Sequence, residues 1–302
     1  VKYPAKWGVQ IAEMIFQTRS NTITGKDTNH MSQSSFGNKF KVTTWGESHG
    51  KALGAVIDGC PAGLPLCEED IQKFLDRRKP GQSRYTTARK EGDLVEILSG
   101  VFEGKTTGTP ISLMVRNTDQ RSRDYGNIAY SYRPGHADYT FDQKYGFRDY
   151  RGGGRSSGRE TIGRVAAGAI ASKILEELGI SICTYTRSIG PVEIASFNKE
   201  EIHQNAFYMP DAQAAVKAGE YLEECMKNQD SAGGVIECRI TGTPAGLGEP
   251  VFDKLSALLA HALMSIGAVK AVEIGDGIAV TSSNGSTDND GFTVKDGEII
   301  KT

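Results

Sequence analysis

The chain has 302 residues, 38% of them hydrophobic and 24% charged, and its formal net charge is −2. This size and mixture are typical of a folded globular protein with one large domain or two ordinary ones, and the slight acidic excess argues against a protein that coats nucleic acid without specificity. No apolar run approaches the roughly 20 residues needed to cross a bilayer, and five widely spaced cysteines without a Cys-x-x-Cys pair predict neither a disulfide framework nor a zinc site, so a cytoplasmic location is expected.

The first 30 residues differ from the rest because they lack the glycine-rich character that follows. We expect Met31 to be the natural start, residues 1–30 to be a disordered N-terminal extension, and residues 31–302 to form the folded domain. The acidic residues Glu13 and Asp27, together with the scarcity of arginine, are unlike a transit peptide.

In chain order, the hydrophobic pattern predicts strands and helices that follow one another without an internal repeat. The expected strands cover 40–45, 52–58, 94–101, 111–115, 181–189, 192–195 and 234–240. The expected helices cover 68–78, 160–178, 211–227 and 252–265. Helices and strands mixed in this way predict an α+β fold with helices packed on sheets.

Two regions do not follow a simple pattern. The polar region 116–158 is too long for an ordinary loop, and loops of that length usually carry function or short elements of their own. The tail from Ser282 is rich in Asn, Asp, Gly and Ser, and it is expected to be a loop.

The first candidate functional residue is His49, in the run Gly46-Glu47-Ser48-His49-Gly50. The run lies between two predicted strands, and its glycines allow the backbone to approach a ligand. A histidine near its ordinary pKa of about 6.5 can give or take a proton at neutral pH. A turn histidine that is merely hydrogen-bonded to Glu47 is the alternative.

The second candidate is His136, in the run Arg133-Pro134-Gly135-His136-Ala137-Asp138. Pro134 stiffens this turn and Gly135 opens it. Asp138 either orients the histidine ring or caps the segment that follows. No group of potential metal ligands has the spacing of a metal site, so no metal is expected.

The run Arg151-Gly152-Gly153-Gly154-Arg155-Ser156-Ser157-Gly158-Arg159 clusters arginines and glycines immediately before a predicted helix. Successive glycine amides can form a concave donor nest for an anion, and the helix start adds its positive end. Arg155 can form a bidentate pair with phosphate, and Ser156 and Ser157 can cap the helix or donate to a phosphate. A flexible surface loop of solvated arginines is the alternative.

Further arginines lie in other segments, among them Arg77, Arg78 and Arg84. Their distribution over several loops fits a small ligand with several negative charges. A nucleotide P-loop is disfavoured because the Gly-Lys-Ser/Thr ending is missing. An RNA-binding surface at 151–159 is a weaker alternative, because no aromatic residues alternate with the arginines as a stacking platform requires.

Taken together, these runs resemble the signatures of the chorismate synthase family. The resemblance rests on Gly46–Gly50 with Asp58-Gly59, on Arg133–Asp138, and on Gly154–Thr161, and it extends from about Phe36 to the end of the chain. It implies a β-α-β sandwich fold, a homotetramer, and no role for nucleic acid or a membrane.

The resemblance also implies a reaction. Members of the family eliminate phosphate from 5-enolpyruvylshikimate 3-phosphate and remove a ring hydrogen to give chorismate, a step of aromatic amino acid biosynthesis. They require reduced FMN, although the reaction has no net redox change. Whether this chain reduces its own flavin with NADPH is left open.

Site residues follow from the same resemblance, position by position. It implies that His49 is the acid for the leaving phosphate and that His136 lies beside the reduced flavin. The substrate-binding residues that it implies are Ser48, Arg78, Arg84, Arg133 and Arg155. The flavin-binding residues that it implies are Arg155, Ser156, Ser157, Gly267 and Ala268.

Family sequences continue beyond the position that corresponds to Thr302, with further flavin contacts, a substrate arginine and an aspartate. A C-terminally truncated chain is therefore expected, with little turnover as it stands. The alternative function is a catalytically impaired chain that retains only anion and flavin binding.

Overall fold

The structure is a computed structural model that describes residues 34–79, 81, 85, 92–118 and 129–301. The expected extension at 1–30 lies outside the described residues. The chain divides after Thr243 into two compact units. Both combine helices with sheets, which confirms the predicted α+β class.

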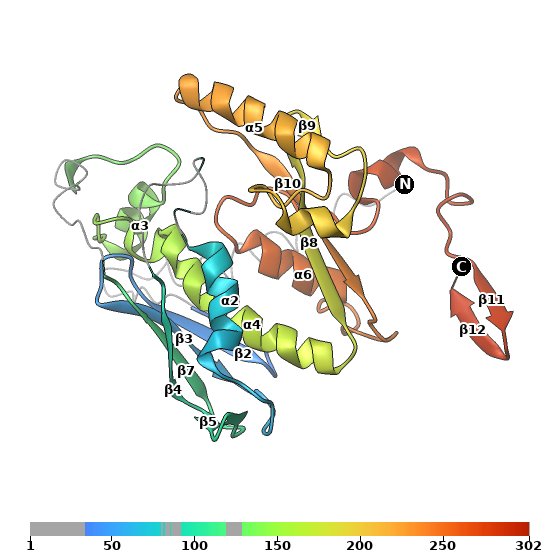
Figure 1. The fold of residues 1–302 in the computed structure, drawn as a ribbon, viewed down its shortest axis with the longest axis horizontal. Helices are drawn as coiled ribbons and strands as arrows, with labels where there is room; N and C mark the ends of the chain where they lie inside the picture. The colour runs from blue at the N-terminus through green and yellow to red at the C-terminus, as the bar shows by residue number, and fades with distance from the viewer. Residues whose placement is uncertain (1–33, 80, 82–84, 86–91, 119–128, 302) are drawn as a thin grey trace. The chain divides into compact units, whose positions relative to one another are not determined.

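A five-stranded antiparallel sheet organises the first unit (Figure 1). Its strands, in spatial order, are β1 (Ser35–Phe36), β2 (Lys41–Gly46), β3 (Ala52–Asp58), β7 (Ile111–Arg116) and β4 (Val95–Ser99). The two longest pairings place β3 between β2 and β7, with Trp45 opposite Gly54. The central strand is therefore the most buried: Leu53, Ala55 and Ile57 are almost fully enclosed.

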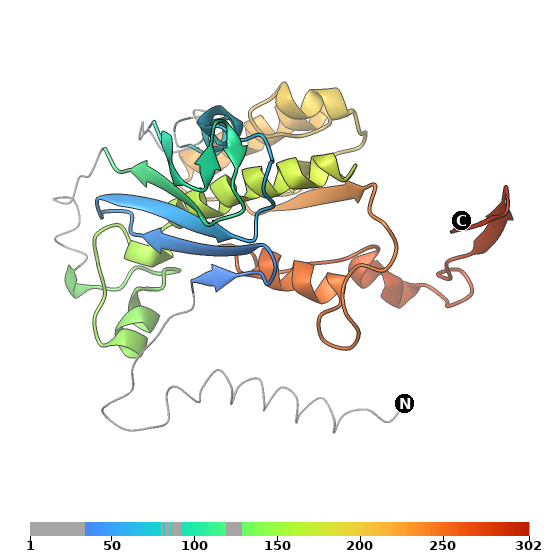
Figure 2. The same cartoon turned by 90° about the horizontal axis from the view of Figure 1, so that it is seen from below.

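Helices α2 (Glu68–Arg78) and α4 (Thr161–Glu177) pack against each other and cover one face of this sheet, as Figures 1 and 2 show. Helix α2 begins with three acidic residues and ends with two arginines, an arrangement that the helix dipole favours. Ile71 and Leu75 of α2, with Ile162 and Ile170 of α4, bury their side chains in the core.

The second part of the first unit is a smaller sheet with one helix. The sheet has the order β10 (Gly234–Thr241), β8 (Ser181–Ile189) and β9 (Val192–Glu193), and α5 (Ala212–Lys227) contacts β9. A short 3₁₀ turn, η4 (Lys199–His203), precedes α5. Asp211 caps the helix by accepting from the backbone N–H groups of Gln213 and Ala214.

One strand prediction needs correction, and two other regions agree with the sequence. The strand expected at 94–101 breaks at Gly100 (φ +83°), so β5 (Val101–Phe102) is separate and pairs with β6 (Lys105–Thr106). The polar region 116–158 holds a short helix of its own, α3 (Asp138–Tyr145), as its length led us to expect. The helix expected at 160–178 is α4 (Thr161–Glu177), and two 3₁₀ turns, η2 (Gly154–Ser156) and η3 (Gly158–Glu160), precede it.

The second unit contains α6 (Leu255–Met264), the 3₁₀ turn η5 (Gly277–Ser282) and a hairpin. The hairpin, β11 (Phe292–Lys295) and β12 (Glu298–Lys301), shows that the prediction of a loop from Ser282 was wrong. Asp296 and Gly297 both have positive φ, as a two-residue hairpin turn requires, and an Asp-Gly pair is a recognised signal for it.

Across the described part of the chain, no helix combines the length and the apolar character that crossing a membrane requires. The strands at 52–58 and 181–189 and the helix at 68–78 have the predicted bounds.

Candidate active site

The turn between β2 and β3 carries Ser48 and His49, as predicted. Gly46 ends β2 with φ +87°, and the amide of Gly50 donates to the carbonyl of Glu47 over 3.0 Å, which closes the turn. Ser48 and His49 are each only 6% exposed. A histidine held inside the protein in this way differs from an ordinary solvated turn residue.

The ring of His49 is tied to a segment far away in the sequence. Its Nδ1 lies 3.2 Å from Ser48 Oγ, and Ser48 Oγ donates to the carbonyl of Gly152 over 3.3 Å. Because the single hydroxyl hydrogen of Ser48 goes to that carbonyl, the hydroxyl accepts from Nδ1–H. This contact fixes the orientation of the ring through Nδ1.

Gly152 packs directly against the His49 ring. Its φ is +62°, and a Cβ at this position would lie 2.2 Å from His49 Cε1 and 2.3 Å from Nδ1. Real Cβ atoms do not approach other atoms so closely, so only glycine allows this ring position. The sequence identified Gly152 as part of a glycine-rich run and did not reveal this contact.

Arg155 contacts the end of β2, where the same turn begins. Its guanidinium donates to the carbonyl of Gly46 over 3.0 Å, to the hydroxyl of Thr44 over 2.6 Å and to the carbonyl of Thr44 over 3.3 Å. These partners are all neutral. Among the described residues no carboxylate forms an ion pair with Arg155, so its positive charge is not compensated within the described site.

A buried carboxylate joins two other arginines. Arg78 Nη1 lies 2.8 Å from Asp93 Oδ2, and Arg159 Nη2 lies 3.0 Å from Asp93 Oδ1. The side chain of Asp93 is 0% exposed. The other two guanidinium nitrogens of Arg78, a predicted substrate ligand, are engaged as well: Nε donates to the hydroxyl of Thr161 over 3.1 Å and Nη2 to the carbonyl of Gly158 over 3.2 Å. Asp93 carried no motif signal, because one acid after a basic segment is unremarkable in sequence.

The turn that carries His136 is built differently. Arg133 donates two hydrogen bonds of 2.9 Å to the carboxylate of Asp138, from Nε and Nη2, and its backbone N–H donates a third of 3.1 Å. The Arg133 guanidinium beside Asp138 lowers the pKa of that carboxyl to about 2. Asp138 therefore holds Arg133 in place; it neither caps α3 through its side chain nor bonds the His136 ring. His136 itself is exposed.

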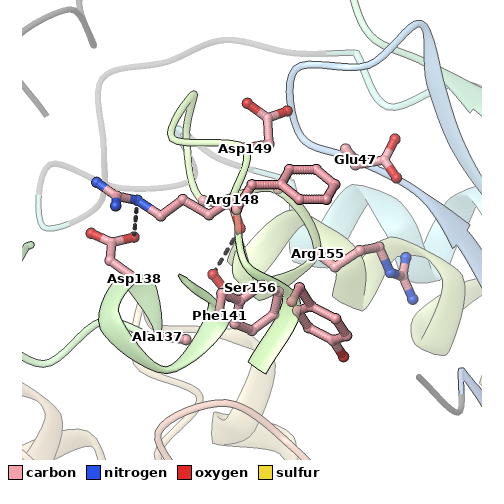
Figure 3. Close-up of a pocket in the computed structure, with 12 residues that line it drawn as sticks. Glu47, Ala137, Asp138, Phe141, Arg148, Asp149, Arg155 and Ser156 are labelled. Atoms are coloured by element: carbon pink, nitrogen blue, oxygen red, sulfur yellow. Dashed lines mark hydrogen bonds and ion pairs between the residues drawn. The ribbon is translucent and has the colours of Figure 1, made fainter. Parts of the chain in front are cut away.

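A pocket of about 390 Å³ has lining residues from the His49 turn (Glu47) and from the His136 turn (Ala137 and Asp138), as Figure 3 shows. Three aromatic side chains, from Phe141, Tyr145 and Phe147, line it. Other residues that line it are Glu47, Ala137, Asp138, Arg148, Asp149, Gly153, Gly154, Arg155 and Ser156. The pocket thus combines a wall of aromatic rings with backbone of the glycine-rich run.

Asp149 was not singled out from the sequence. Burial opposes its ionisation, but hydrogen bonds from Arg151 and the charges of Arg151 and His49 hold the pKa of the carboxyl below its usual value. Arg151 contacts Asp149 over 2.9 and 3.0 Å. Asp149 is therefore an anionic carboxylate in the lining of the pocket.

The remaining predicted ligands divide into three cases. Ser156 Oγ donates to the carbonyl of Gly153 over 2.7 Å, and Ser157 Oγ accepts from the amide of Arg159, so both stabilise the run locally. Gly267 and Ala268 form a turn after α6 in the second unit, where Ala268 has φ +70°. Arg84 lies outside the described residues.

The arginines of the glycine-rich run do not share one open basic face. Arg151 is paired with Asp149, the guanidinium of Arg155 points to β2, and Arg159 is 8% exposed. This arrangement speaks against the alternative of an RNA-binding surface, which needs exposed cations along a strand of nucleic acid.

Comparison with known proteins agrees with the resemblance seen in the sequence. The family model for chorismate synthase matches residues 40–301, and a model for a family of unknown function matches residues 1–29. The chain is 67% identical over 273 residues to the chorismate synthase of Agathobacter rectalis, a match that covers 90% of this chain and 74% of the relative.

Two further relatives are similar. The chorismate synthase of Lachnoclostridium phytofermentans is 65% identical over 274 residues, covering 90% of this chain and 75% of the relative. A crystal structure of a chorismate synthase superposes with a TM-score of 0.73 at 34% identity, covering 87% of this chain and 76% of that one. With a buried histidine turn, a glycine-rich arginine run and these matches, the chain belongs to the chorismate synthase family.

Proposed function

We propose that the protein eliminates phosphate and a ring hydrogen from 5-enolpyruvylshikimate 3-phosphate to give chorismate, with reduced FMN as cofactor. One observation carries the proposal most directly: His49 is enclosed by Gly152 and Ser48, and its turn rests on Arg155. An enclosed proton carrier next to an uncompensated cation suits a reaction that expels phosphate.

In this proposal His49 acts as the acid. Nδ1–H is directed at Ser48 Oγ, so the proton for the leaving phosphate comes from Nε2. Gly152 and Ser48 enclose the ring and limit the access of water to His49, which is 6% exposed.

The pocket fits a flavin in two respects. Phe141, Tyr145 and Phe147 offer aromatic surface for a planar ring system. Arg155 also lines the pocket, and although its guanidinium bonds Gly46 and Thr44, its positive charge attracts an anionic group. When bound, reduced FMN supplies electrons transiently to a reaction without net redox change. His136, exposed in its turn beside α3, is placed to meet a ligand from solvent and to stabilise negative charge on it.

Other implied properties belong to the same proposal. Arg78, Arg84 and Arg133 would contact the phosphate and carboxylates of the substrate, and Ser156, Ser157, Gly267 and Ala268 would contact the flavin. A homotetramer in the cytoplasm is proposed from the family resemblance.

Reduced-flavin-dependent phosphate release tests the proposal. The chain and a form extended to the length of the Agathobacter rectalis relative are assayed anaerobically with 5-enolpyruvylshikimate 3-phosphate, with and without reduced FMN. We expect phosphate and chorismate in equal amounts and only with reduced FMN. Shikimate 3-phosphate, which lacks the enolpyruvyl group, is the control substrate.

The alternative function predicts another result. A protein that binds phosphorylated ligand and FMN in calorimetry but releases no phosphate in either form would be an anion- and flavin-binding protein without turnover. Absence of both binding and turnover would contradict both functions.

A further inference from the structure

Asn117 bridges the two ends of the His49 turn. It follows directly after β7, and its side-chain amide donates to the carbonyl of Glu47 over 3.0 Å and to the carbonyl of Gly50 over 2.8 Å. Its backbone N–H donates to the carbonyl of Lys51 over 3.1 Å. The segment between these carbonyls carries Ser48 and His49, so one side chain spans the residues that present the imidazole.

The other end of the Asn117 amide is also held. Its Oδ1 accepts from Arg159 Nη2 over 2.8 Å. Two carbonyl acceptors on one side and a guanidinium donor on the other leave only one orientation of the amide that satisfies all three partners.

Arg159 is in turn fixed by the buried carboxylate of Asp93, which also holds Arg78. The turn is thereby joined to the C-terminal end of α2 through side chains alone. The inner links are enclosed, because the side chains of Arg159 and Asp93 are 10% and 0% exposed, whereas Asn117 is half-buried. Bonds among enclosed polar groups are costly to break, so this set of contacts keeps one geometry.

We propose that Asn117 is a positioning residue for His49 and that the Arg78–Asp93–Arg159 group holds Asn117 in its working orientation. The proposal rests on the proposed function, in which His49 is the acid. Its physical basis is that a bond to the carbonyls on both sides of Ser48-His49 fixes the direction of Nε2. Displacement of a reacting group by about 1 Å can cost roughly 100-fold in rate.

The most informative substitution is Asn117→Asp. The carboxylate keeps the acceptor for Arg159 but replaces the donor by oxygen, which faces the carbonyls of Glu47 and Gly50. The carboxylate of the variant then repels these two carbonyls, while its bond to Arg159 remains. Asn117→Ala removes all three bonds without adding charge and is the second variant. Thr118→Ala, an exposed neighbour, is the matched control.

A double-mutant cycle with His49→Ala separates positioning from general stability. We expect Asn117→Asp to lower kcat by roughly 10- to 100-fold with KM within about threefold. In the His49→Ala background the same change should lower kcat by less than about twofold, because nothing remains to be positioned. An equal loss in both backgrounds, or a kcat for Asn117→Asp within about twofold of the unsubstituted protein, would overturn the proposal.

Nitrogen-detected NMR of the histidine rings gives a readout that does not depend on turnover. The chain has five histidines, and His49→Ala assigns the signal of interest. We expect Asn117→Asp and Asn117→Ala to displace the His49 signal and to leave the other histidine signals in place. An unmoved His49 signal in a folded variant contradicts positioning. Full activity of His49→Ala would refute the role of His49 in the proposed function, and the NMR result would still decide whether Asn117 positions the ring.

Discussion

The two histidine turns look alike in sequence and differ in structure. His49 is 6% exposed and its turn is held from β2, from Gly152, from Arg155 and from Asn117. His136 is exposed, and its turn is held mainly by one arginine–carboxylate pair. A glycine next to a histidine therefore indicates that other backbone segments can approach the ring closely. How far the ring is enclosed depends on how many distant segments contact the turn in the folded protein.

The difference suits the two proposed roles. A proton donor to a leaving group benefits from one fixed direction and from the absence of competing water. A residue that stabilises charge on a ligand arriving from solvent needs access more than enclosure. Substitutions that loosen the first turn should therefore affect turnover more than matched substitutions in the second.

The largest expected effect is that of His49→Ala. Loss of a positioned general acid typically costs about 100- to 10,000-fold, so kcat should fall by that factor with little change in substrate affinity. Steady-state phosphate release and calorimetry measure the two quantities. His203→Ala, in η4, should leave both unchanged. A His49 variant within about threefold of the unsubstituted protein would remove this residue from the catalytic group.

Gly152→Ala and Gly135→Ala compare the turns directly, because both glycines have positive φ. A Cβ at Gly135 meets nothing within 4 Å, whereas one at Gly152 meets the His49 ring at 2.2 Å. Both variants should lose roughly 1–2 kcal/mol of stability from backbone strain. Only Gly152→Ala should also lower kcat, by about 100-fold. Urea unfolding and turnover measure these effects, and equal kcat values for the two variants would contradict the enclosure of His49.

Arg155→Lys tests whether the uncompensated cation acts through its shape or only through its charge. A lysine cannot reproduce the bonds to Gly46 and Thr44 together with a bidentate contact to phosphate. Affinity for FMN or for the phosphorylated substrate should fall by roughly 1.5–3 kcal/mol in calorimetry. Arg151→Lys, at an exposed pair, is the control. Unchanged affinity for both ligands would show that Arg155 only supports β2.

The smallest effect concerns the His136 turn. The pKa of Asp138 is lowered from 3.8 to about 2 by Arg133, so the ion pair stabilises the fold above pH 4 and the contribution disappears as pH falls toward 2. A shift of this size corresponds to at most about 2.5 kcal/mol. Urea unfolding should show Asp138→Asn to be less stable by up to that amount at pH 7, with the difference shrinking between about pH 4 and pH 2. A difference that is independent of pH would contradict the ion pair.

The sequence by itself determined the class of the fold, most element bounds, the family and the two histidine turns. These features are local: apolar spacing sets helices and strands, and runs such as Gly46–Gly50 are contiguous in the chain. The hairpin at 292–301 was also encoded locally, in Asp296-Gly297, and was missed because the polar composition around it outweighed that signal.

Tertiary structure alone decided which side chains meet. Gly152 reaches His49 across 103 positions of sequence, Arg155 reaches Gly46, and Asp93 joins Arg78 to Arg159. No local pattern records such pairs, because packing of α4 on the sheet brings the glycine-rich run to the β2–β3 turn. The same packing placed carboxylates or carbonyls beside arginines that sequence alone presented as open to an anion, since a cation drawn into a protein interior must find a partner.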